Sequence, residues 1–346
     1  MEYNIDILVA GCNTTCQHCY VNGGIGQEMS IEDFRLCIEK LKPSFECLGE
    51  KISFTLDNEV YNHSRADLIL KYVEEKCKKN YYHHGSTTGI AILNHPKRQE
   101  IIGILKRNCW MEVSFAIHGG IENHNQMVRN ENAMQSIQEA YQLFESEGFD
   151  IWFSIMLSKV LRADIDEVSK LLSDFSNYRG IAVIPNYLPT KRLKDYQKYR
   201  CTQEECKGFI SFLNEHHIET KKLIGQVEEF HEEKIIQTID RERMGSILEA
   251  DDTVFFHILP NLDFYVGNTG IQLKYIGNMN TLNSAEIGKI ILEQKGNYYE
   301  TLKCHYDDMI ESVEKGNLEL SKENYVYPSM VDGVLAMIEN FYARNS

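Results

Sequence analysis

Three cysteines near the start of the chain carry the clearest chemical signal in the sequence. Cys12, Cys16 and Cys19 are spaced as C-x3-C-x2-C and follow a strand-like apolar run at residues 4–10. Thiolates are the usual ligands of iron–sulfur clusters. Three of them supply the ligands for a cubane of four irons and leave one iron without a protein ligand. A small molecule with an adjacent amine and carboxylate could chelate that open iron.

Two alternative roles for these cysteines stay open. They could form part of a zinc site, with His18 or a distant residue as the fourth ligand. They could also be unrelated core thiols, because free cysteine is often buried as a small hydrophobe. A strand before the motif and a helix after it favour the cluster, since structural context confirms a motif better than its letters do.

Residues 12–20, which read CNTTCQHCY, resemble the motif of the radical S-adenosylmethionine (radical SAM) superfamily. The ring of His18 stands where that family has an aromatic residue. The resemblance implies a [4Fe–4S] cluster that passes one electron to S-adenosylmethionine (SAM), and an electron donor such as flavodoxin or ferredoxin. SAM then splits into methionine and a 5′-deoxyadenosyl radical, which takes a hydrogen atom from the substrate. The cofactor carries this chemistry, while the protein supplies binding and orientation.

The composition is that of a globular protein of about two domains. The chain has 346 residues, of which 43% are hydrophobic and 25% charged, and no apolar run is long enough to span a membrane. Ten cysteines without an export signal indicate a reducing cytoplasm. The net charge of −15 makes nucleic acid an unfavourable partner.

Strand-like and helix-like segments alternate over six units in the first part of the chain. Such alternation implies a parallel sheet with right-handed crossovers, whose active site lies at the carboxyl ends of the strands. The resemblance implies a partial (β/α)6 TIM-type barrel. The expected strands cover residues 4–10, 51–56, 88–93, 111–117, 151–157 and 181–184, and the expected helices cover 30–42, 64–79, a segment opening at 96, 132–148, 164–175 and 202–217.

A smaller α+β accessory domain is expected at residues 218–346, after a barrel at residues 1–217. Short strands at 254–259, 264–266 and 271–276 are followed by helices, and residues 219–251 read as charged and mostly helical. The hairpin is similar to the SPASM or twitch-type accessory domain of radical SAM enzymes, but the cysteines that hold extra clusters there are missing. Cys201, Cys206 and Cys304 match no cluster spacing.

The resemblance also implies residues that contact SAM. Glu59 follows the second strand, where family members place acceptors for the SAM amino group, and a carboxylate suits an ammonium. Arg129 is a bidentate partner for the SAM carboxylate. Ser114 and Ser154, on the fourth and fifth strands, are further candidates for binding the cofactor. A solvated loop acid is the structural alternative for Glu59.

Two residues are candidates for contact with the substrate. His118 stands where the family has an aspartate, and could donate a hydrogen bond or accept a proton; it could equally cap a turn. Tyr187, at the tip of the sixth strand, is the weaker candidate. Ala116, His118 and the pair Asp57-Asn58 depart from the family pattern, which leaves a paralogue without turnover as an alternative.

The sequence therefore predicts a radical SAM enzyme that abstracts a hydrogen atom from an unactivated carbon. The first strand begins within the first few residues, with no precursor-binding domain ahead of it, which favours a small biosynthetic metabolite as substrate. A ribosomally made peptide is the alternative substrate. A zinc- or cluster-binding protein without catalysis is the alternative of another class.

Overall fold

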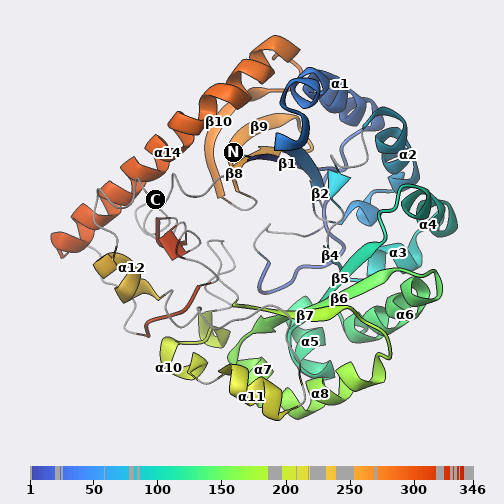
Figure 1. Cartoon of the computed structure of the whole chain (residues 1–346), viewed down its shortest axis with the longest axis vertical. Helices are drawn as coiled ribbons and strands as arrows, with labels where there is room; N and C mark the ends of the chain where they lie inside the picture. The colour runs from blue at the N-terminus through green and yellow to red at the C-terminus, as the bar shows by residue number, and fades with distance from the viewer. Residues whose placement is uncertain are drawn as a thin grey trace.

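The computed structural model shows strands that line the inner side of an incomplete ring of helices (Figure 1). It describes residues 2–19, 24, 26–57, 59–77, 82–83, 86–185, 197–207, 209–216, 218, 231–238, 253–268, 271–316, 323–327, 330, 333–334 and 336–338. The expected fold class, a partial α/β barrel with an accessory region, is confirmed.

The described strands form two sheets. The first has the order β10-β9-β8-β1-β2-β3 and the second the order β4-β5-β6-β7. All pairs from β1 to β7 within the sheets are parallel, so their carboxyl ends meet at one end of the barrel. The strands are β1 (Glu2–Leu8), β2 (Ile52–Asp57), β3 (Tyr82–His83), β4 (Ser86–Thr87), β5 (Glu112–Ile117), β6 (Asp150–Leu157), β7 (Gly180–Pro185), β8 (Thr253–Ile258), β9 (Asp263–Asn268) and β10 (Ile271–Asn278).

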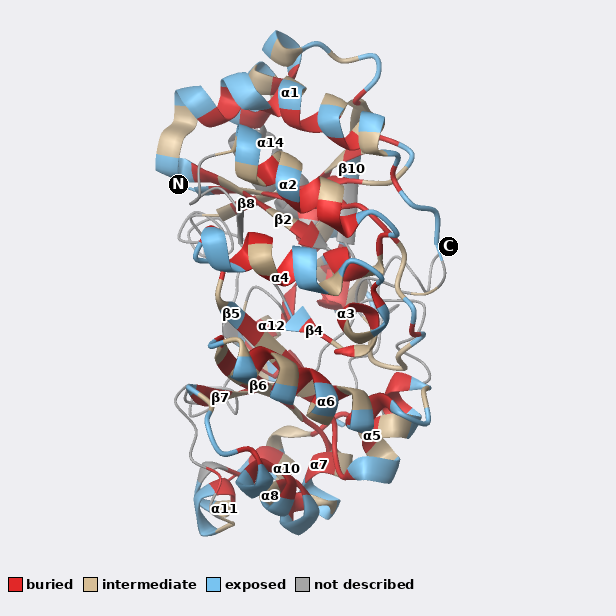
Figure 2. Ribbon diagram, turned by 90° about the vertical axis from the view of Figure 1, so that its right-hand side faces the viewer, coloured by how far each residue is buried: buried red, intermediate tan, exposed pale blue. Residues whose placement is uncertain are grey.

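Helices cover the outer face of the strands, and their exposed residues lie on the outside of the ring (Figure 2). α1 begins with a cap in which Ser30 Oγ accepts from the Asp33 amide at 3.0 Å. The described helices are α1 (Ile31–Leu48), α2 (Ala66–Lys76), α3 (Ile90–Asn94), α4 (Arg98–Arg107), α5 (Ile121–Val128), α6 (Ala133–Ser146), α7 (Lys159–Ala163), α8 (Ile165–Asp174), α10 (Gln203–Cys206), α11 (Phe209–Glu215), α12 (Glu232–Thr238) and α14 (Ser284–Glu314), with single 3-10 turns at Gly49–Lys51, Val60–Asn62 and Gln197–Tyr199.

Alternation along the strands separates an outer face from an inner face. On β6, Ile151, Phe153, Ile155 and Leu157 are buried, and the residues between them are only half-buried. Phe153 packs on Phe175, which follows α8, with ring centroids 4.8 Å apart. The apolar residues therefore face the helices, and the alternate residues, including Ser154, face the inside of the barrel.

The expected third strand at residues 88–93 is wrong. This segment contains Gly89, whose φ is +79°, followed by helix α3. The third strand is instead the two short pieces β3 and β4, which pair with β2 and β5. A left-handed glycine breaks an extended strand, and a short apolar run such as Ile-Ala-Ile-Leu does not distinguish a buried strand from a buried helix.

Two expected helix bounds also differ from the structure. α1 runs to Leu48 and contains Pro43, whereas the sequence predicts an end at residue 42. The helix expected at residues 202–217 is two helices, α10 and α11. Of the segment at 219–251, which the sequence predicts to be mostly helical, only α12 and the residue before it are described.

The C-terminal hairpin extends the barrel's own sheet. β8 pairs in parallel with β1, and β9 and β10 follow in antiparallel register. α14 packs along α1 (Figure 1), and Lys40 Nζ on α1 donates to the carbonyl of Leu282 at 2.7 Å. Among the described helices, none combines the length and apolar character needed to cross a bilayer.

Candidate functional site

The cysteine loop leaves the carboxyl end of β1 and is held by its own backbone. The Cys12 amide donates to the Gly24 carbonyl at 2.7 Å, and the Met29 amide donates to the Val9 carbonyl at 2.8 Å. A Cβ on Gly11 would lie 2.2 Å from the Gly26 nitrogen, so only glycine allows the two segments to approach this closely. The loop is therefore closed at its base, at the end of the barrel where ligands bind in this architecture.

Thr14 places two of the three sulfurs. Its hydroxyl lies 3.2 Å from Cys12 Sγ and 3.3 Å from Cys16 Sγ. Cys19 follows one short turn later, its amide donating to the Cys16 carbonyl at 3.3 Å. The sequence motif gave no role to Thr14, although a hydroxyl between two cysteines is a donor suited to sulfur ligands.

The pKa of the Cys16 thiol is raised to about 12, mainly by burial and in part by the neighbouring sulfurs of Cys19 and Cys12, while the Thr14 hydrogen bond opposes the rise. Three thiolates packed together repel one another unless a cation lies among them. The donor set of soft sulfur ligands fits iron–sulfur clusters or zinc. No three His, Cys, Asp or Glu side chains within the described ranges lie close enough to bind a single metal ion together.

The end of α5 meets the cysteine loop. The Gln17 amide donates to the Met127 carbonyl at 2.8 Å, and Gln17 Nε2 donates to the Gln126 carbonyl at 3.0 Å. Arg129 follows as the cap of α5 with a left-handed φ of 60°. Arg129 therefore lies two residues beyond the contact with the cysteine loop, and its side chain is exposed. Its role as partner of the SAM carboxylate stays a prediction.

His118 is buried beneath the cysteine loop. Its ring centroid lies 3.7 Å from that of His18 and 5.4 Å from that of His124, and its backbone amide donates to His124 Nδ1 at 3.3 Å. Burial lowers the pKa of His118, as do the two neighbouring imidazoles. The rings of His118 and His124 therefore lie in line behind His18, the residue that precedes Cys19. The prediction that His118 faces the substrate stays untested.

Glu59 lies just past the end of β2, as expected, and is tied to the end of β4. Its carboxylate accepts from the Thr87 hydroxyl, from the Thr88 amide at 3.0 Å and from the Thr88 hydroxyl at 3.0 Å. Burial raises the pKa of Glu59, and these hydrogen bonds oppose the rise. The carboxylate is therefore oriented by two threonines that the sequence motif did not identify, the last residue of β4 and the residue after it.

Ser114 and Ser154 come together inside the barrel. Their hydroxyls lie 3.1 Å apart, across the paired strands β5 and β6. Both are half-buried on the inner face of the second sheet. The structure therefore places these two predicted residues side by side, and their predicted contact with the cofactor stays a prediction.

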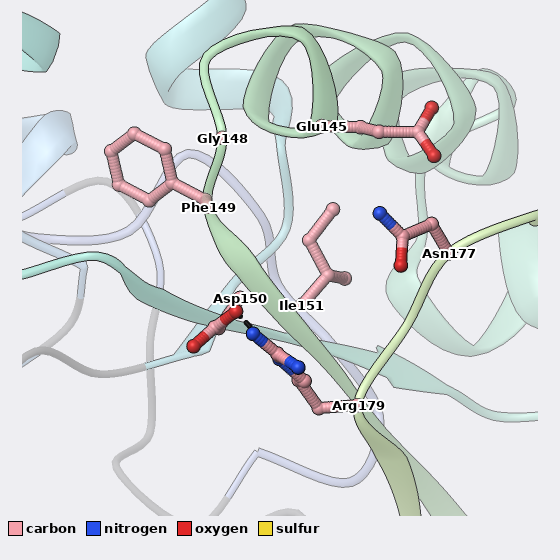
Figure 3. A pocket seen from close by; sticks show the side chains of 7 residues that line it. All are labelled: Glu145, Gly148, Phe149, Asp150, Ile151, Asn177 and Arg179. Atoms are coloured by element: carbon pink, nitrogen blue, oxygen red, sulfur yellow. Dashed lines mark hydrogen bonds and ion pairs between the residues drawn. The ribbon is translucent and has the colours of Figure 1, made fainter.

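Some candidate residues lie apart from this group or cannot be placed. Tyr187 lies outside the described residues. Cys201 and Cys206 are buried, and Cys304 is exposed on α14. A small open pocket lined by Glu145, Phe149 and Ile151 lies at the amino end of β6 (Figure 3), where Arg179 Nε pairs with Asp150 Oδ1 at 2.6 Å. The pocket therefore lies at the amino ends of the parallel strands, whereas the cysteine loop lies at their carboxyl ends.

No protein-family model matches the chain, and no curated protein matches its sequence. Solved structures of radical SAM enzymes align with nearly all of it. One is Streptococcus suis SuiB bound to its precursor peptide SuiA. The alignment covers 96% of this chain and 76% of the SuiB chain, with a TM-score of 0.60 and 11% sequence identity. The chain has the radical SAM fold. Another is native anSMEcpe with bound AdoMet, which is SAM. This alignment covers 99% of this chain and 97% of the anSMEcpe chain, with a TM-score of 0.57 and 13% sequence identity.

A third structure extends this comparison. The anSMEcpe complex with AdoMet and the Cp18Cys peptide covers 99% of this chain and 98% of its own, with a TM-score of 0.53 and 13% identity. The suspected resemblance to the radical SAM superfamily is thus confirmed at the level of the fold. The three cysteines lie on the loop after β1 of this fold, with the end of α5 against that loop.

Proposed function

We propose that the protein is a radical SAM enzyme whose [4Fe–4S] cluster is held by Cys12, Cys16 and Cys19. The observation that carries the proposal is the placement of the three thiols on one closed loop at the carboxyl end of β1, in a chain with the radical SAM fold. When bound, the cluster and SAM would supply a 5′-deoxyadenosyl radical that abstracts a hydrogen atom from the substrate.

In this proposal the chain's own residues bind SAM and orient it. Glu59 accepts from the SAM ammonium, and Thr87 and Thr88 hold its carboxylate in place by hydrogen bonds. Arg129 pairs with the SAM carboxylate from the end of α5. Ser114 and Ser154, whose hydroxyls lie 3.1 Å apart on the inner face, contact the adenosine half. An electron donor such as flavodoxin or ferredoxin reduces the cluster in the cytoplasm.

A peptide is the substrate class that the comparisons favour. SuiB was solved with its precursor peptide SuiA, and anSMEcpe with the Cp18Cys peptide. The preference for a small metabolite rests only on where this chain begins, and no contact of the described residues supports it. We therefore infer a peptide substrate, with the small metabolite as the alternative, and an accessory domain from residue 218 onward that helps to shape the substrate site.

The test is the metal content and the electron paramagnetic resonance spectrum of anaerobically reconstituted protein. We expect about four irons per chain and, after reduction, a spectrum that changes when SAM is added. Cys16→Ala loses the cluster, whereas Cys47→Ala, which removes an exposed thiol on α1, keeps it. Tightly bound zinc without iron would instead support the zinc-binding alternative and contradict the proposal.

A further inference from the structure

The inner face of the first sheet carries a continuous row of polar side chains. Asp6 on β1 is paired with Thr55 on β2 and with His257 on β8. His257 is paired in turn with Tyr265 on β9, and Tyr265 with Tyr275 on β10. Residues directly opposite one another in a sheet project from the same face. These five residues, here called the inner row, therefore face the same side.

That side is the interior of the barrel. The alternate residues Ile5, Phe54 and Phe256 are fully buried in the layer between the strands and the helices. Phe54 stacks on Phe45 of α1 with ring centroids 5.7 Å apart. Since successive side chains of a strand point to opposite faces, Asp6 and His257 point inward. Asp6 lies two residues before the end of β1, about 7 Å along the strand from its carboxyl end.

Asp6 is already held in place. Its Oδ1 accepts from the Thr55 hydroxyl, and from Asn4 Nδ2 at 3.2 Å. Its Oδ2 lies 3.9 Å from His257 Nε2, and the two side chains are 5% and 2% exposed. This gap is longer than a hydrogen bond, and such contacts commonly tighten when substrate binds. The hydrogen bonds to Oδ1 orient the Asp6 carboxylate so that its second oxygen, Oδ2, faces the His257 imidazole.

His257 is the unusual member of the row. Both of its ring nitrogens are buried, and neither has a hydrogen-bond partner. A buried polar atom without a hydrogen-bond partner destabilises the folded state, so its presence in a folded protein needs a cause. Burial lowers the pKa of His257, and Asp6 partly opposes this. The titratable groups paired with it across the sheet are Asp6 from β1 and Tyr265 from β9.

We propose that Asp6 and His257 form a proton-accepting pair that binds a substrate hydroxyl, thiol or amino group inside the barrel. Asp6 Oδ2 holds the Nε2–H of His257, which leaves Nδ1 as the acceptor. This is the arrangement by which a carboxylate sets the tautomer of a basic imidazole.

The step is a proton transfer alone. The substrate X–H bond breaks, an Nδ1–H bond forms, and the Asp6 carboxylate stabilises the imidazolium. No electron is moved and no co-reactant is needed. This inference rests on the proposed function, because loss of a hydrogen atom from the carbon that bears a hydroxyl, thiol or amine makes that group's proton more acidic.

The first test measures hydrogen–deuterium exchange at the His257 C2 position against pH in the holo-protein, by mass spectrometry. We expect a midpoint below 6.5 that falls by about one further pH unit in Asp6→Asn, because an opposite charge at this distance raises a histidine pKa by that amount or more. The matched control is Asp166→Asn, which removes the carboxylate 2.7 Å from His216 on the surface. An unchanged His257 midpoint in Asp6→Asn overturns the pair.

The second test measures 5′-deoxyadenosine formation with short peptides that contain serine, cysteine or lysine, against the same peptides with the side-chain group methylated. We expect stimulation by at least one unmodified peptide, lost on methylation. His257→Gln should lose at least tenfold of the peptide-stimulated rate, and His257→Asn serves where the glutamine variant folds poorly. His216→Gln, the control, should keep both the stimulated rate and the rate without peptide.

The outcomes separate the two proposals. If wild-type protein forms no 5′-deoxyadenosine, the proposed function fails, and the exchange measurement still decides whether the pair exists. If wild-type protein forms it but no hydroxyl, thiol or amine peptide stimulates it, or the methylated peptides stimulate equally, the pair's role as substrate base is contradicted. A His257→Gln variant with wild-type stimulation contradicts it as well.

Discussion

The amide and the hydroxyl of Thr88 both donate to one carboxylate oxygen of Glu59, each at 3.0 Å. Through this contact, the loop after β2 is joined to the loop after β4, across the gap between the two described sheets. Glu59, which the sequence predicts to bind SAM, thus also connects two loops of the fold. Its replacement should change both stability and cofactor binding.

Glu59→Gln tests this double role. The amide NH2 would face the Thr88 donors in place of an oxygen, so we expect the free energy of unfolding to fall by about 1–2 kcal/mol. Loss of the charge should raise the SAM dissociation constant about tenfold or more. Urea unfolding and equilibrium binding of SAM measure the two effects. The control is Glu74→Gln, whose carboxylate pairs with Arg107 on the outside of the barrel; SAM affinity that fell equally in that variant would contradict a specific role.

Thr14→Val tests the hydroxyl between Cys12 and Cys16. Valine keeps the shape of threonine but cannot donate to sulfur, and hydrogen bonds to sulfur ligands help to set a cluster's reduction potential. We expect a potential lower by some tens of millivolts, on the order of one sulfur hydrogen bond, while Thr14→Ser stays near wild type. Redox titration of the reconstituted cluster measures the shift. Equal potentials in all three proteins would show that the hydroxyl does not reach the cluster.

The burial of His124 leads us to expect that the free energy of unfolding decreases at acid pH. Burial lowers its pKa from 6.5 to about 4, so between these values the unfolded chain binds a proton that the folded chain does not. Stability is therefore full above pH 6.5 and falls as the pH drops towards 4, by at most about 1.4 kcal/mol per pH unit. His124→Asn keeps an acceptor for the His118 amide and should flatten this dependence.

The measurement is the free energy of unfolding, obtained by urea titration at about pH 7.5, 6 and 5, which follows the protonation of His124. His216→Asn, in which a partly exposed histidine is replaced, is the control and should follow wild type. Parallel loss of stability in wild type and His124→Asn would show that other groups cause the acid sensitivity.

Ser114 and Ser154 should be coupled to one another. A hydroxyl pair at 3.1 Å on the inner face predicts an interaction energy of about 0.5–1.5 kcal/mol in a double-mutant cycle of the two alanine variants. Both single variants should also weaken SAM binding. A coupling energy near zero would contradict the contact, and unchanged SAM affinity in both would remove the serines from the cofactor site.

Much of the barrel could be predicted because its pattern is local. Five of the six expected strands, all except residues 88–93, overlap strands of the structure. That segment failed because its apolar residues suit a helix equally well, and only the left-handed Gly89 decides between the two. The position of the cysteine loop after the first strand was predictable because its three cysteines lie close together in sequence.

Contacts between distant segments could not be predicted. Nothing local in the sequence indicates that Thr88 orients Glu59, that His18 stacks on His118, or that Asp6 meets His257 across 251 positions of the chain. The last of these depends on β8 joining β1 rather than forming a separate sheet. The one signal that marked Asp6 was a charged residue inside the apolar run at residues 4–10.

The most direct test of the central claim is the formation of 5′-deoxyadenosine by anaerobically reconstituted protein given SAM and dithionite. We predict that wild type and Cys47→Ala form it and that Cys12→Ala, Cys16→Ala and Cys19→Ala do not, because in the proposed function the three thiols together hold the cluster. Formation at the wild-type rate by any of the three cysteine variants, or no product from wild type with a full cluster and peptide present, would contradict the account.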